Sequence, residues 1–279
     1  MAGPGILFVV PTPIGNLEDI TIRATRVLAE VDLIAAEDTR HTRKLLSHLG
    51  ITTPLQSYYR GQEAKQGQRL LAELEAGKNI ALVSDAGTPA ISDPGTRLVR
   101  LCHEHGIQVI PLPGPSAVTT LVSGSGLADD GYTFLGFLPS KKGQRRKVLQ
   151  SHLYDILPFV LYESPRRILA TLTDIVDILG DRKICFGREL SKLYEELMVA
   201  TVSELQKELT ARSSVRGEIV MIVDGSKEVE AASPGDIPEL LAALRRQGLS
   251  MKDAVQKISH DLGEKRSDIY KIGLQVWKD

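Results

Sequence analysis

The chain has 279 residues, of which 42% are hydrophobic, and it carries 34 Lys and Arg against 35 Asp and Glu. This composition is that of an ordinary globular protein, which excludes collagen-like, coiled-coil and wholly disordered chains. The net charge of −1 excludes a protein that coats polyanions with its whole surface, so any nucleic-acid contact must come from a local cationic patch.

The sequence shows no pattern that is typical of a membrane-spanning segment or of a metal site. The longest apolar runs, such as Gly5–Val10 and Ile219–Val223, are too short to cross a bilayer, and the N-terminus lacks the pattern of a secretory signal. The two cysteines, Cys102 and Cys185, are too few for a disulfide framework, and the six histidines show no metal-binding spacing. We therefore expect a reduced, cytoplasmic protein that has no membrane association and no metal.

The first 116 residues alternate strand and helix patterns. Short apolar runs predict strands at Ile6–Val10, Val31–Ala36, Ile80–Val83 and Ile107–Ile110. Amphipathic segments between them predict helices at Ile22–Ala29, Arg69–Ala76 and Thr96–His105. This alternation predicts a mostly parallel α/β domain over residues 1–116.

Strand patterns outnumber helix patterns in the next segment. They predict strands at Tyr132–Leu138, Phe159–Tyr162, Ile184–Phe186 and Ile219–Val223. A helix is predicted over Pro165–Leu179, with Ser164 as its N-cap and Gly180 at its end. We expect a second α+β domain with a mixed sheet over residues 117–227.

The last part of the chain predicts a small helical module over residues 228–279. Residues 228–238 have the composition of a linker. Three short amphipathic helices are predicted at Ile237–Gln247, Ser250–Leu262 and Arg266–Trp277. Such a module resembles helix-turn-helix domains that bind nucleic acid. Its balanced charge favours the alternative, a plain packing or dimerisation element.

Three turns rich in Gly and Pro follow predicted strands of the first domain. They are Pro11–Asn16, Ser84–Gly95 and Pro111–Ala117. Ligands of open α/β sheets lie beyond the carboxyl ends of the strands, so the three turns predict a pocket. The turns carry Asp85 and Asp93 but no lysine, and neither a phosphate-binding nor a dinucleotide-binding glycine motif occurs. This pattern favours a cationic or neutral ligand.

Several ordered motifs in the chain resemble the tetrapyrrole methylase superfamily. They are Pro11–Thr21, Ala36–Arg40, Ser84–Gly95, Pro113–Ala117, Gly136–Pro139, Glu163–Arg167 and Arg188–Leu190. Together they look like the branch that methylates ribosomal RNA. Members that modify tetrapyrroles have a glycine-rich first loop ending in Gly-Asp, whereas this chain has prolines there and Asn16 in place of the acid. The departure favours the RNA branch.

The resemblance implies a fold, a cofactor and a reaction. The implied fold has two α/β domains with S-adenosylmethionine in the cleft between them, and the implied assembly is a homodimer. The implied activity is 2′-O-methylation of a cytidine ribose in 16S RNA of the small ribosomal subunit. Two alternatives stay open, which are a methylase of a corrinoid or porphyrin and a non-catalytic RNA-binding assembly factor.

Residues are assigned to the cofactor by matching them to the family's motifs. The first two loops supply Pro13, Ile14, Gly15, Asp85, Gly87 and Thr88. The third loop supplies Ser116 and Ala117, and Tyr162 matches the adenosine side. A pocket with Asp85 and no lysine suits a cationic sulfonium.

Catalytic and RNA-binding residues are predicted from the chemistry of the reaction. A general base would help a ribose hydroxyl to attack, and the candidates are Glu189 first, then Asp38, Lys192 and Glu163. Glu189 could instead only pair with an arginine, Asp38 and Arg40 could pair or orient RNA, and positioning without a base stays possible. Five cations within seven residues predict phosphate contacts. These are Lys141, Lys142, Arg145, Arg146 and Lys147.

Overall fold

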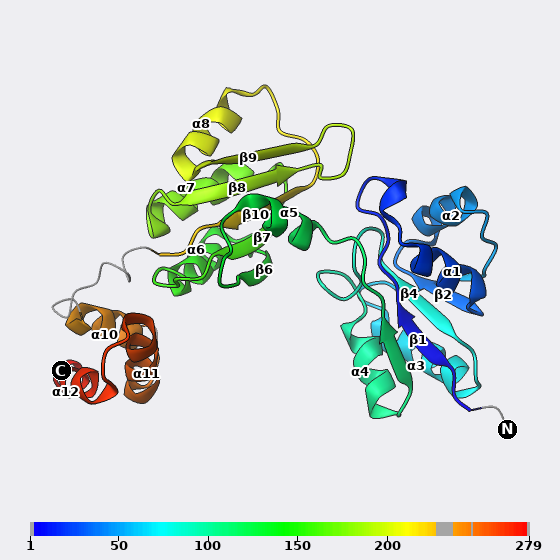
Figure 1. The fold of residues 1–279 in the computed structure, drawn as a ribbon, viewed down its shortest axis with the longest axis horizontal. Helices are drawn as coiled ribbons and strands as arrows, with labels where there is room; N and C mark the ends of the chain where they lie inside the picture. Colours follow the sequence, from blue (N-terminus) through cyan, green and yellow to red (C-terminus); the bar gives the residue numbers. More distant parts are fainter. Residues whose placement is uncertain (1–2, 227–236, 247, 278–279) are drawn as a thin grey trace. The chain divides into compact units, whose positions relative to one another are not determined.

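The computed structural model describes residues 3–226, 237–246 and 248–277 (Figure 1). The chain divides into two compact units, Met1–Gly124 with Gly187–Leu197 and Ser125–Phe186 with Met198–Asp279. The predicted domain limits at residues 116 and 227 stay a prediction. Residues 227–236, which hold most of the predicted linker, lie outside the described residues.

The first unit contains a five-stranded sheet in the order β3-β2-β4-β1-β5, and every neighbouring pair in it is parallel. Its strands are β1 (Ile6–Val9), β2 (Leu33–Ala36), β3 (Leu55–Ser57), β4 (Ile80–Val83) and β5 (Gln108–Pro111). Its helices are η1 (Leu17–Asp19), α1 (Ile22–Glu30), α2 (Thr39–His48), α3 (Glu63–Glu75), α4 (Thr96–Glu104) and α5 (Ala117–Ser125).

Helices cover both faces of this sheet (Figure 1). On one face, Leu7 and Leu82 pack with Leu70 of α3 and Leu98 of α4. On the other face, side chains of α1 and α2 pack against the alternate strand positions. Every residue of β4 is buried as a result, which explains its continuous apolar run.

Strand β3 and helix α2 of the first unit carry no long apolar run, so the sequence does not predict them. Strand β3 has only three residues, all partly exposed at the sheet edge. Helix α2 buries Leu45 and Leu46 but is otherwise polar. Helix α3 begins at Glu63, six residues before the predicted start at Arg69, because its first turns bury Gln66 and Gly67 rather than large apolar side chains.

The second unit is built around a mixed sheet in the order β6-β7-β10-β8-β9. Strand β7 is parallel to β6 and antiparallel to β10. The strands are β6 (Thr133–Phe137), β7 (Phe159–Glu163), β8 (Lys183–Arg188), β9 (Glu196–Thr201) and β10 (Ile219–Val223). The helices are α6 (Lys142–Ser151), α7 (Ile168–Leu179) and α8 (Val202–Ala211). Their apolar faces pack with strand side chains in one core.

The predicted start of α7 is wrong. The helix begins at Ile168, and Ser164 is followed by a turn in which its carbonyl accepts from the amides of Arg167 and Ile168. The Ser164 amide donates instead to the carboxylate of Glu163 at 2.7 Å. The network around Glu163 therefore sets the entry of the chain into α7, and α7 has no side-chain cap.

The three predicted C-terminal helices are present as α10 (Ile237–Arg246), α11 (Met251–Leu262) and α12 (Arg266–Val276). Leu241, Val255 and Ile269 contribute to a core of their own. Ser250 caps α11, and Gly263 ends it in the left-handed conformation that the predicted break requires. No helix in the described part of the chain is long and apolar enough to span a membrane.

Candidate functional site

The three Gly- and Pro-rich loops of the first unit are joined by hydrogen bonds. Thr12 and Gly87 exchange backbone hydrogen bonds, each at 2.9 Å. The buried Thr12 hydroxyl donates to the Ser84 carbonyl at 3.1 Å. The Thr88 hydroxyl donates to the Pro115 carbonyl at 3.0 Å. The turns after β1, β4 and β5 thus form one continuous surface at the carboxyl edge of the sheet, as the sequence predicts.

Glycines allow these loops to approach one another. Gly87 has a φ of 76°, and a side chain there would lie 3.4 Å from Ile14. A Cβ atom on Gly114 would lie only 2.7 Å from Pro11. The first loop therefore lies against both of the others, which places Ile14 at their junction.

Carboxylates gather at the same edge. Asp85 Oδ1 accepts the backbone amide of Asp38 at 3.0 Å, which ties the second loop to the end of β2. Partial burial, together with the charges of Asp93 and Asp85, raises the pKa of Glu37 above its usual value. Sequence reasoning did not single out Glu37, because the residues that act on it are distant in the chain. The edge presents negative charge, as the loop composition predicts.

Asp38 and Arg40 pair with each other. Asp38 caps α2 and accepts from Arg40 through the backbone amide at 2.8 Å and the guanidinium Nη2 at 2.8 Å. These bonds hold the pKa of the Asp38 carboxyl far below its usual range. Arg40 has 88% of its side chain exposed, so a ligand phosphate can still reach its guanidinium.

Glu189 and Lys192 form an ion pair at the turn between β8 and β9, which belongs to the first unit. Lys192 Nζ lies 2.9 Å from Glu189 Oε1. Glu189 has a φ of 50° and Ser191 a φ of 67°, backbone conformations that residues other than glycine rarely adopt. Strain of this kind clusters at functional sites.

This turn lies against the first loop. The Ser191 hydroxyl donates to the carboxylate of Asp19, and any side chain on Gly15 would collide with the Lys192 stem. A hollow of about 410 Å³ opens beside the contact. It is lined by Ile14, Asp19, Thr21, Gly114, Pro115, Thr120, Ser191 and Glu195. The fold thus brings the predicted first and third loops together with the segment that carries Glu189 and Lys192. Pro115 lines the hollow, and the predicted Ser116 and Ala117 are the next two residues in the sequence.

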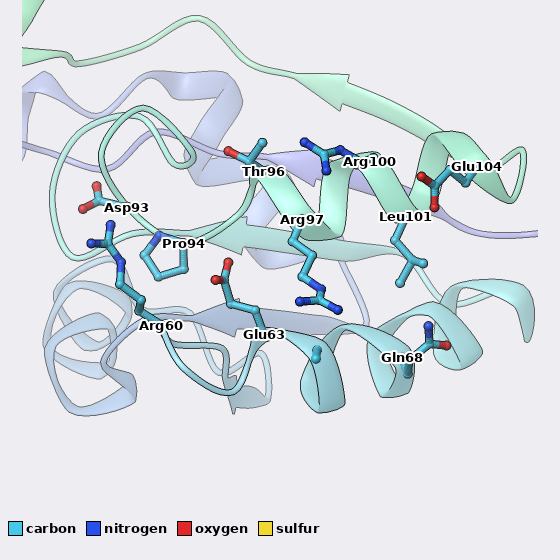
Figure 2. Close-up of a pocket in the computed structure, with 11 residues that line it drawn as sticks. Arg60, Glu63, Gln68, Asp93, Pro94, Thr96, Arg97, Arg100, Leu101 and Glu104 are labelled. Atoms are coloured by element: carbon cyan, nitrogen blue, oxygen red, sulfur yellow. The ribbon is translucent and has the colours of Figure 1, made fainter. Parts of the chain in front are cut away.

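A second hollow of about 510 Å³ lies between α3 and α4 (Figure 2). Arg60, Arg97 and Arg100 line it together with three carboxylates, and Figure 2 shows Arg60 directed toward Asp93. None of the residues predicted for cofactor, catalysis or RNA lines this hollow. Its mixed charges do not select a ligand class.

Tyr162 lies on β7 of the second unit, within a group of aromatic rings. Its ring centroid is 5.2 Å from that of Phe134 and 5.4 Å from that of Phe137. The neighbouring Glu163 is buried and accepts from Thr171 at 2.6 Å and from Arg167 at 3.2 Å. These bonds give Glu163, one of the predicted candidates for a general base, a structural role beside Arg167 and Thr171.

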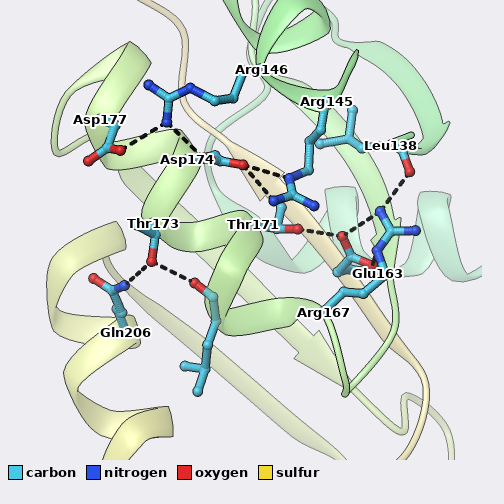
Figure 3. A network of polar contacts seen from close by, with 11 residues as sticks. Leu138, Arg145, Arg146, Glu163, Arg167, Thr171, Thr173, Asp174, Asp177 and Gln206 are labelled. Carbon is cyan, nitrogen blue, oxygen red and sulfur yellow. Dashed lines mark hydrogen bonds and ion pairs between the residues drawn. The ribbon is translucent and has the colours of Figure 1, made fainter. Parts of the chain in front are cut away.

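The run of five cations contains two arginines that are held by carboxylates (Figure 3). Arg145 is buried and its Nη2 lies 2.6 Å from Asp174, whose side chain is also buried. Arg146 contacts Asp174 at 2.8 Å and Asp177 at 2.9 Å. By contrast, Lys141, Lys142 and Lys147 are exposed.

The structure also bears on the metal and thiol chemistry of the chain. Within the described ranges, no group of three or more His, Cys, Asp and Glu side chains is arranged to hold a metal ion. Burial raises the pKa of the Cys102 and Cys185 thiols to about 11, so neither thiol forms a thiolate at neutral pH. Both cysteines are buried and unpaired.

A model of the tetrapyrrole (corrin/porphyrin) methylases matches residues 7–206. The chain belongs to the tetrapyrrole methylase family. Among curated tetrapyrrole methylase relatives, it is 46% identical to ribosomal RNA small subunit methyltransferase I of Escherichia coli O157:H7, over 97% of this chain and 95% of that protein. It is 43% identical to the protein of the same name from Synechocystis, over 99% of both chains.

Two solved methyltransferases share the fold. Uroporphyrin-III C-methyltransferase from Thermus thermophilus, solved with S-adenosyl homocysteine, superposes with a TM-score of 0.57 at 20% identity, over 82% of this chain and 100% of that one. The methyltransferase CobJ gives a TM-score of 0.59 at 18% identity, over 80% and 95% of the two chains. The predicted family and its α/β fold class, with a parallel first sheet, a mixed second sheet and C-terminal helices, are confirmed.

Proposed function

We propose that this tetrapyrrole methylase family member transfers a methyl group from S-adenosylmethionine to the ribose 2′-oxygen of a cytidine in small-subunit ribosomal RNA. The observation that carries the proposal is its similarity, at 46% identity over nearly the whole chain, to a relative named as a methyltransferase of that RNA. The likeness to tetrapyrrole-modifying enzymes is 17–20% in sequence and concerns the fold alone.

The carboxyl edge of the first sheet suits the proposed cofactor. Asp85 and the half-buried Glu37 place negative charge there, and the loop from Ser84 to Gly95 contains no lysine. Such a field attracts a sulfonium and an ammonium group. Gly87 and Gly114 let the three loops pack closely against one another, which gives the cofactor a single continuous surface to bind. We assign Pro13, Ile14, Gly15, Asp85, Gly87, Thr88, Ser116 and Ala117 to this cofactor, with Tyr162 from the second unit.

S-adenosylmethionine supplies an electrophilic methyl group on a positively charged sulfur. The protein must then orient the ribose oxygen, which is worth roughly 7–11 kcal/mol when alignment is good. A base adds about 10²–10⁴-fold to the rate. Glu189, held in a strained turn by Lys192, is our first candidate for accepting the hydroxyl proton. Asp38 is a weaker candidate, because its lowered pKa makes its carboxylate a poor base.

The cations proposed for RNA differ in burial, and we assign their roles accordingly. Arg145 is buried on Asp174, so we assign to it the anchoring of α6 rather than a phosphate. Arg146 shares this role, while Lys141, Lys142, Lys147 and the exposed Arg40 are proposed to meet RNA phosphates.

The assembly and location of the protein are also proposals. We propose a homodimer in the cytoplasm that needs no metal. Sedimentation equilibrium should give twice the 30.5 kDa chain mass. Methyl transfer should persist in the presence of a chelator.

The first experiment is methyl transfer from labelled S-adenosylmethionine to small ribosomal subunits that lack modification. The label should map by nuclease digestion and mass spectrometry to a ribose oxygen of one cytidine. A parallel reaction contains a uroporphyrinogen acceptor instead of RNA. Label on the porphyrin and not on RNA would replace the proposal with a tetrapyrrole methylase. Binding of subunits without turnover would indicate an assembly factor.

A further inference from the structure

The last residue of strand β6 carries an aromatic ring that the fold leaves open. Phe137 is 58% exposed, which is unusual for a phenylalanine at the edge of a sheet. The register of β6 against β7 shifts between Phe134 and Gly136, and Gly136 has a φ of 62°. A bulge of this kind re-aims the side chain that follows it. The ring of Phe137 is thus directed by a specific backbone feature.

Other rings support Phe137 from one side. Tyr162 lies 5.4 Å away with an interplanar angle of 51°, and Phe134 meets Tyr162 edge-on at 5.2 Å. Such tilted and edge-on contacts are the favourable geometries for aromatic pairs. The three rings form a supported platform, and the exposed part of Phe137 is available to a further planar group.

The backbone beyond Phe137 is fixed by a buried ion pair (Figure 3). The carbonyl of Leu138 accepts from Arg167 Nη2 at 2.6 Å. Arg167 in turn contacts Glu163, whose side chain is fully buried and which also accepts from Thr171. Arg167 holds the Leu138 backbone, and Glu163 holds Arg167. The platform is therefore pre-organised for a ligand.

Exposed lysines follow the platform along the chain. Lys141 and Lys142 come four and five residues after Phe137. Lys141 is the N-cap of α6, and Lys142 and Lys147 lie on this helix; all three are exposed. Helix α6 is locked by the ion pairs of Arg145 and Arg146 with Asp174 on α7, so the burial of the arginines leaves the lysines outside. An aromatic platform followed along the chain by exposed lysines combines the two features that bind unpaired nucleic-acid strands.

We propose that Phe137 stacks an unpaired nucleobase of the RNA substrate while Lys141, Lys142 and Lys147 contact the adjoining phosphates. The inference rests on the proposed function and adds to it that the bound segment is single-stranded. Sequence-tolerant stacking supplies affinity because every base has a planar face. The charge of the three exposed lysines favours RNA over an apolar protein partner.

The test uses the full chain and a fluorescein-labelled, unstructured RNA of about 12 nucleotides, with affinity measured by anisotropy at several salt concentrations. Phe137→Ala should weaken binding roughly tenfold or more at every salt concentration. The salt dependence should stay unchanged, because stacking releases no counterions. Phe137→Trp should restore affinity. The triple variant Lys141→Ala, Lys142→Ala, Lys147→Ala should instead make the negative slope of log K against log salt shallower by about 2.

Two controls make the result specific. Tyr59→Ala removes an aromatic side chain that is 40% exposed just after β3 in the first unit, and it should bind RNA like the parent chain. The affinity of Phe137→Ala for S-adenosylmethionine should equal that of the parent chain. A loss of cofactor affinity without a loss of RNA affinity would overturn the inference and assign the ring to the cofactor nucleoside.

The inference and the proposed function fail in different ways. If the parent chain methylates small subunits and Phe137→Ala binds the RNA probe equally well, the stacking site is wrong and the function stands. If the parent chain neither binds RNA nor methylates subunits, both are overturned.

Discussion

Asp85 combines a structural and an electrostatic role in one side chain. Its Oδ1 accepts the amide of Asp38, and its charge contributes to the raised pKa of Glu37. Asn in this position keeps an oxygen that can accept the same amide but removes the charge. The two roles can therefore be separated by a single substitution.

We expect Asp85→Asn to weaken the binding of S-adenosylmethionine about tenfold, because a lost opposite charge several ångström away is worth on the order of 1–2 kcal/mol at intermediate dielectric. S-adenosylhomocysteine, whose sulfur is neutral, should lose less affinity. Titration calorimetry with both ligands measures the difference. Equal losses for the two ligands would show that Asp85 does not act through the sulfonium charge.

Glu37 gives a prediction about pH. Burial and the charges of Asp93 and Asp85 raise the pKa of Glu37 in the folded protein. An acid with a raised pKa binds its proton more tightly when folded, so its contribution to stability is present at low pH and is lost as pH rises through the raised pKa. Glu37→Gln should therefore raise the Tm at pH 7 relative to the parent chain, with a smaller gain at pH 4.

The matched control for Glu37 is Glu75→Gln, which changes an exposed carboxylate at the end of α3. Its Tm should follow the parent chain at both pH values. A Glu37→Gln protein that is less stable at pH 7 would mean that the ionised carboxylate is used in a favourable contact. In that case Glu37 stabilises the edge rather than carrying strain for ligand binding.

At the scale of elements, helices α6 and α7 are joined through one buried carboxylate. Asp174 is 1% exposed and accepts from both Arg145 and Arg146. Asp174→Ala leaves the buried Arg145 guanidinium without its counter-ion, which should destabilise the fold by about 3–5 kcal/mol. Asp177→Ala removes only an exposed contact of Arg146 and should cost about 1 kcal/mol or less. Urea unfolding of the two variants measures the contrast.

The ion pairs of Asp174 also predict acid sensitivity. Its two arginines outweigh burial and hold the pKa of Asp174 below its usual value. Its stabilising contribution is thus complete at neutral pH and is lost as pH falls below about 4. The stability difference between the parent chain and Asp174→Asn should shrink over that acid range. A difference that stays constant down to pH 2 would contradict the assignment.

Elements with continuous burial are those that the sequence predicts well. Strands β4 and β10 are buried at every residue, so their apolar runs reveal them. Strand β9 lies at a sheet edge with alternating exposure, and helix α6 begins with cations, so neither presents an apolar pattern. Local sequence shows burial on two faces more readily than pairing at an edge.

The candidate site divides in the same way. The three loops can be predicted because Gly and Pro favour turns through their own backbone conformations. The split of the cation run into anchoring arginines and exposed lysines depends on Asp174, which comes from another helix. The Glu189–Lys192 pair could be proposed from spacing, but its contact with the first loop arises only from the fold.

At the scale of the whole molecule, the chain builds separate cores. The first unit has a core on each face of its parallel sheet, and the second unit has one large core around Phe159, Phe186 and Met221. The three C-terminal helices enclose a further small core. Each of these cores lies within a single unit, which favours unfolding in more than one step.

Calorimetry can test whether the units unfold separately. We expect heat unfolding in at least two transitions, with Asp174→Ala lowering the temperature of one transition by several degrees and leaving the other in place, because Asp174 lies in the second unit. S-adenosylmethionine should raise most the transition that Asp174→Ala leaves unchanged, since all of its proposed residues except Tyr162 lie in the first unit. A single transition that moves as a whole in both experiments would show that the units unfold together, and a ligand effect on the second unit alone would place the cofactor elsewhere.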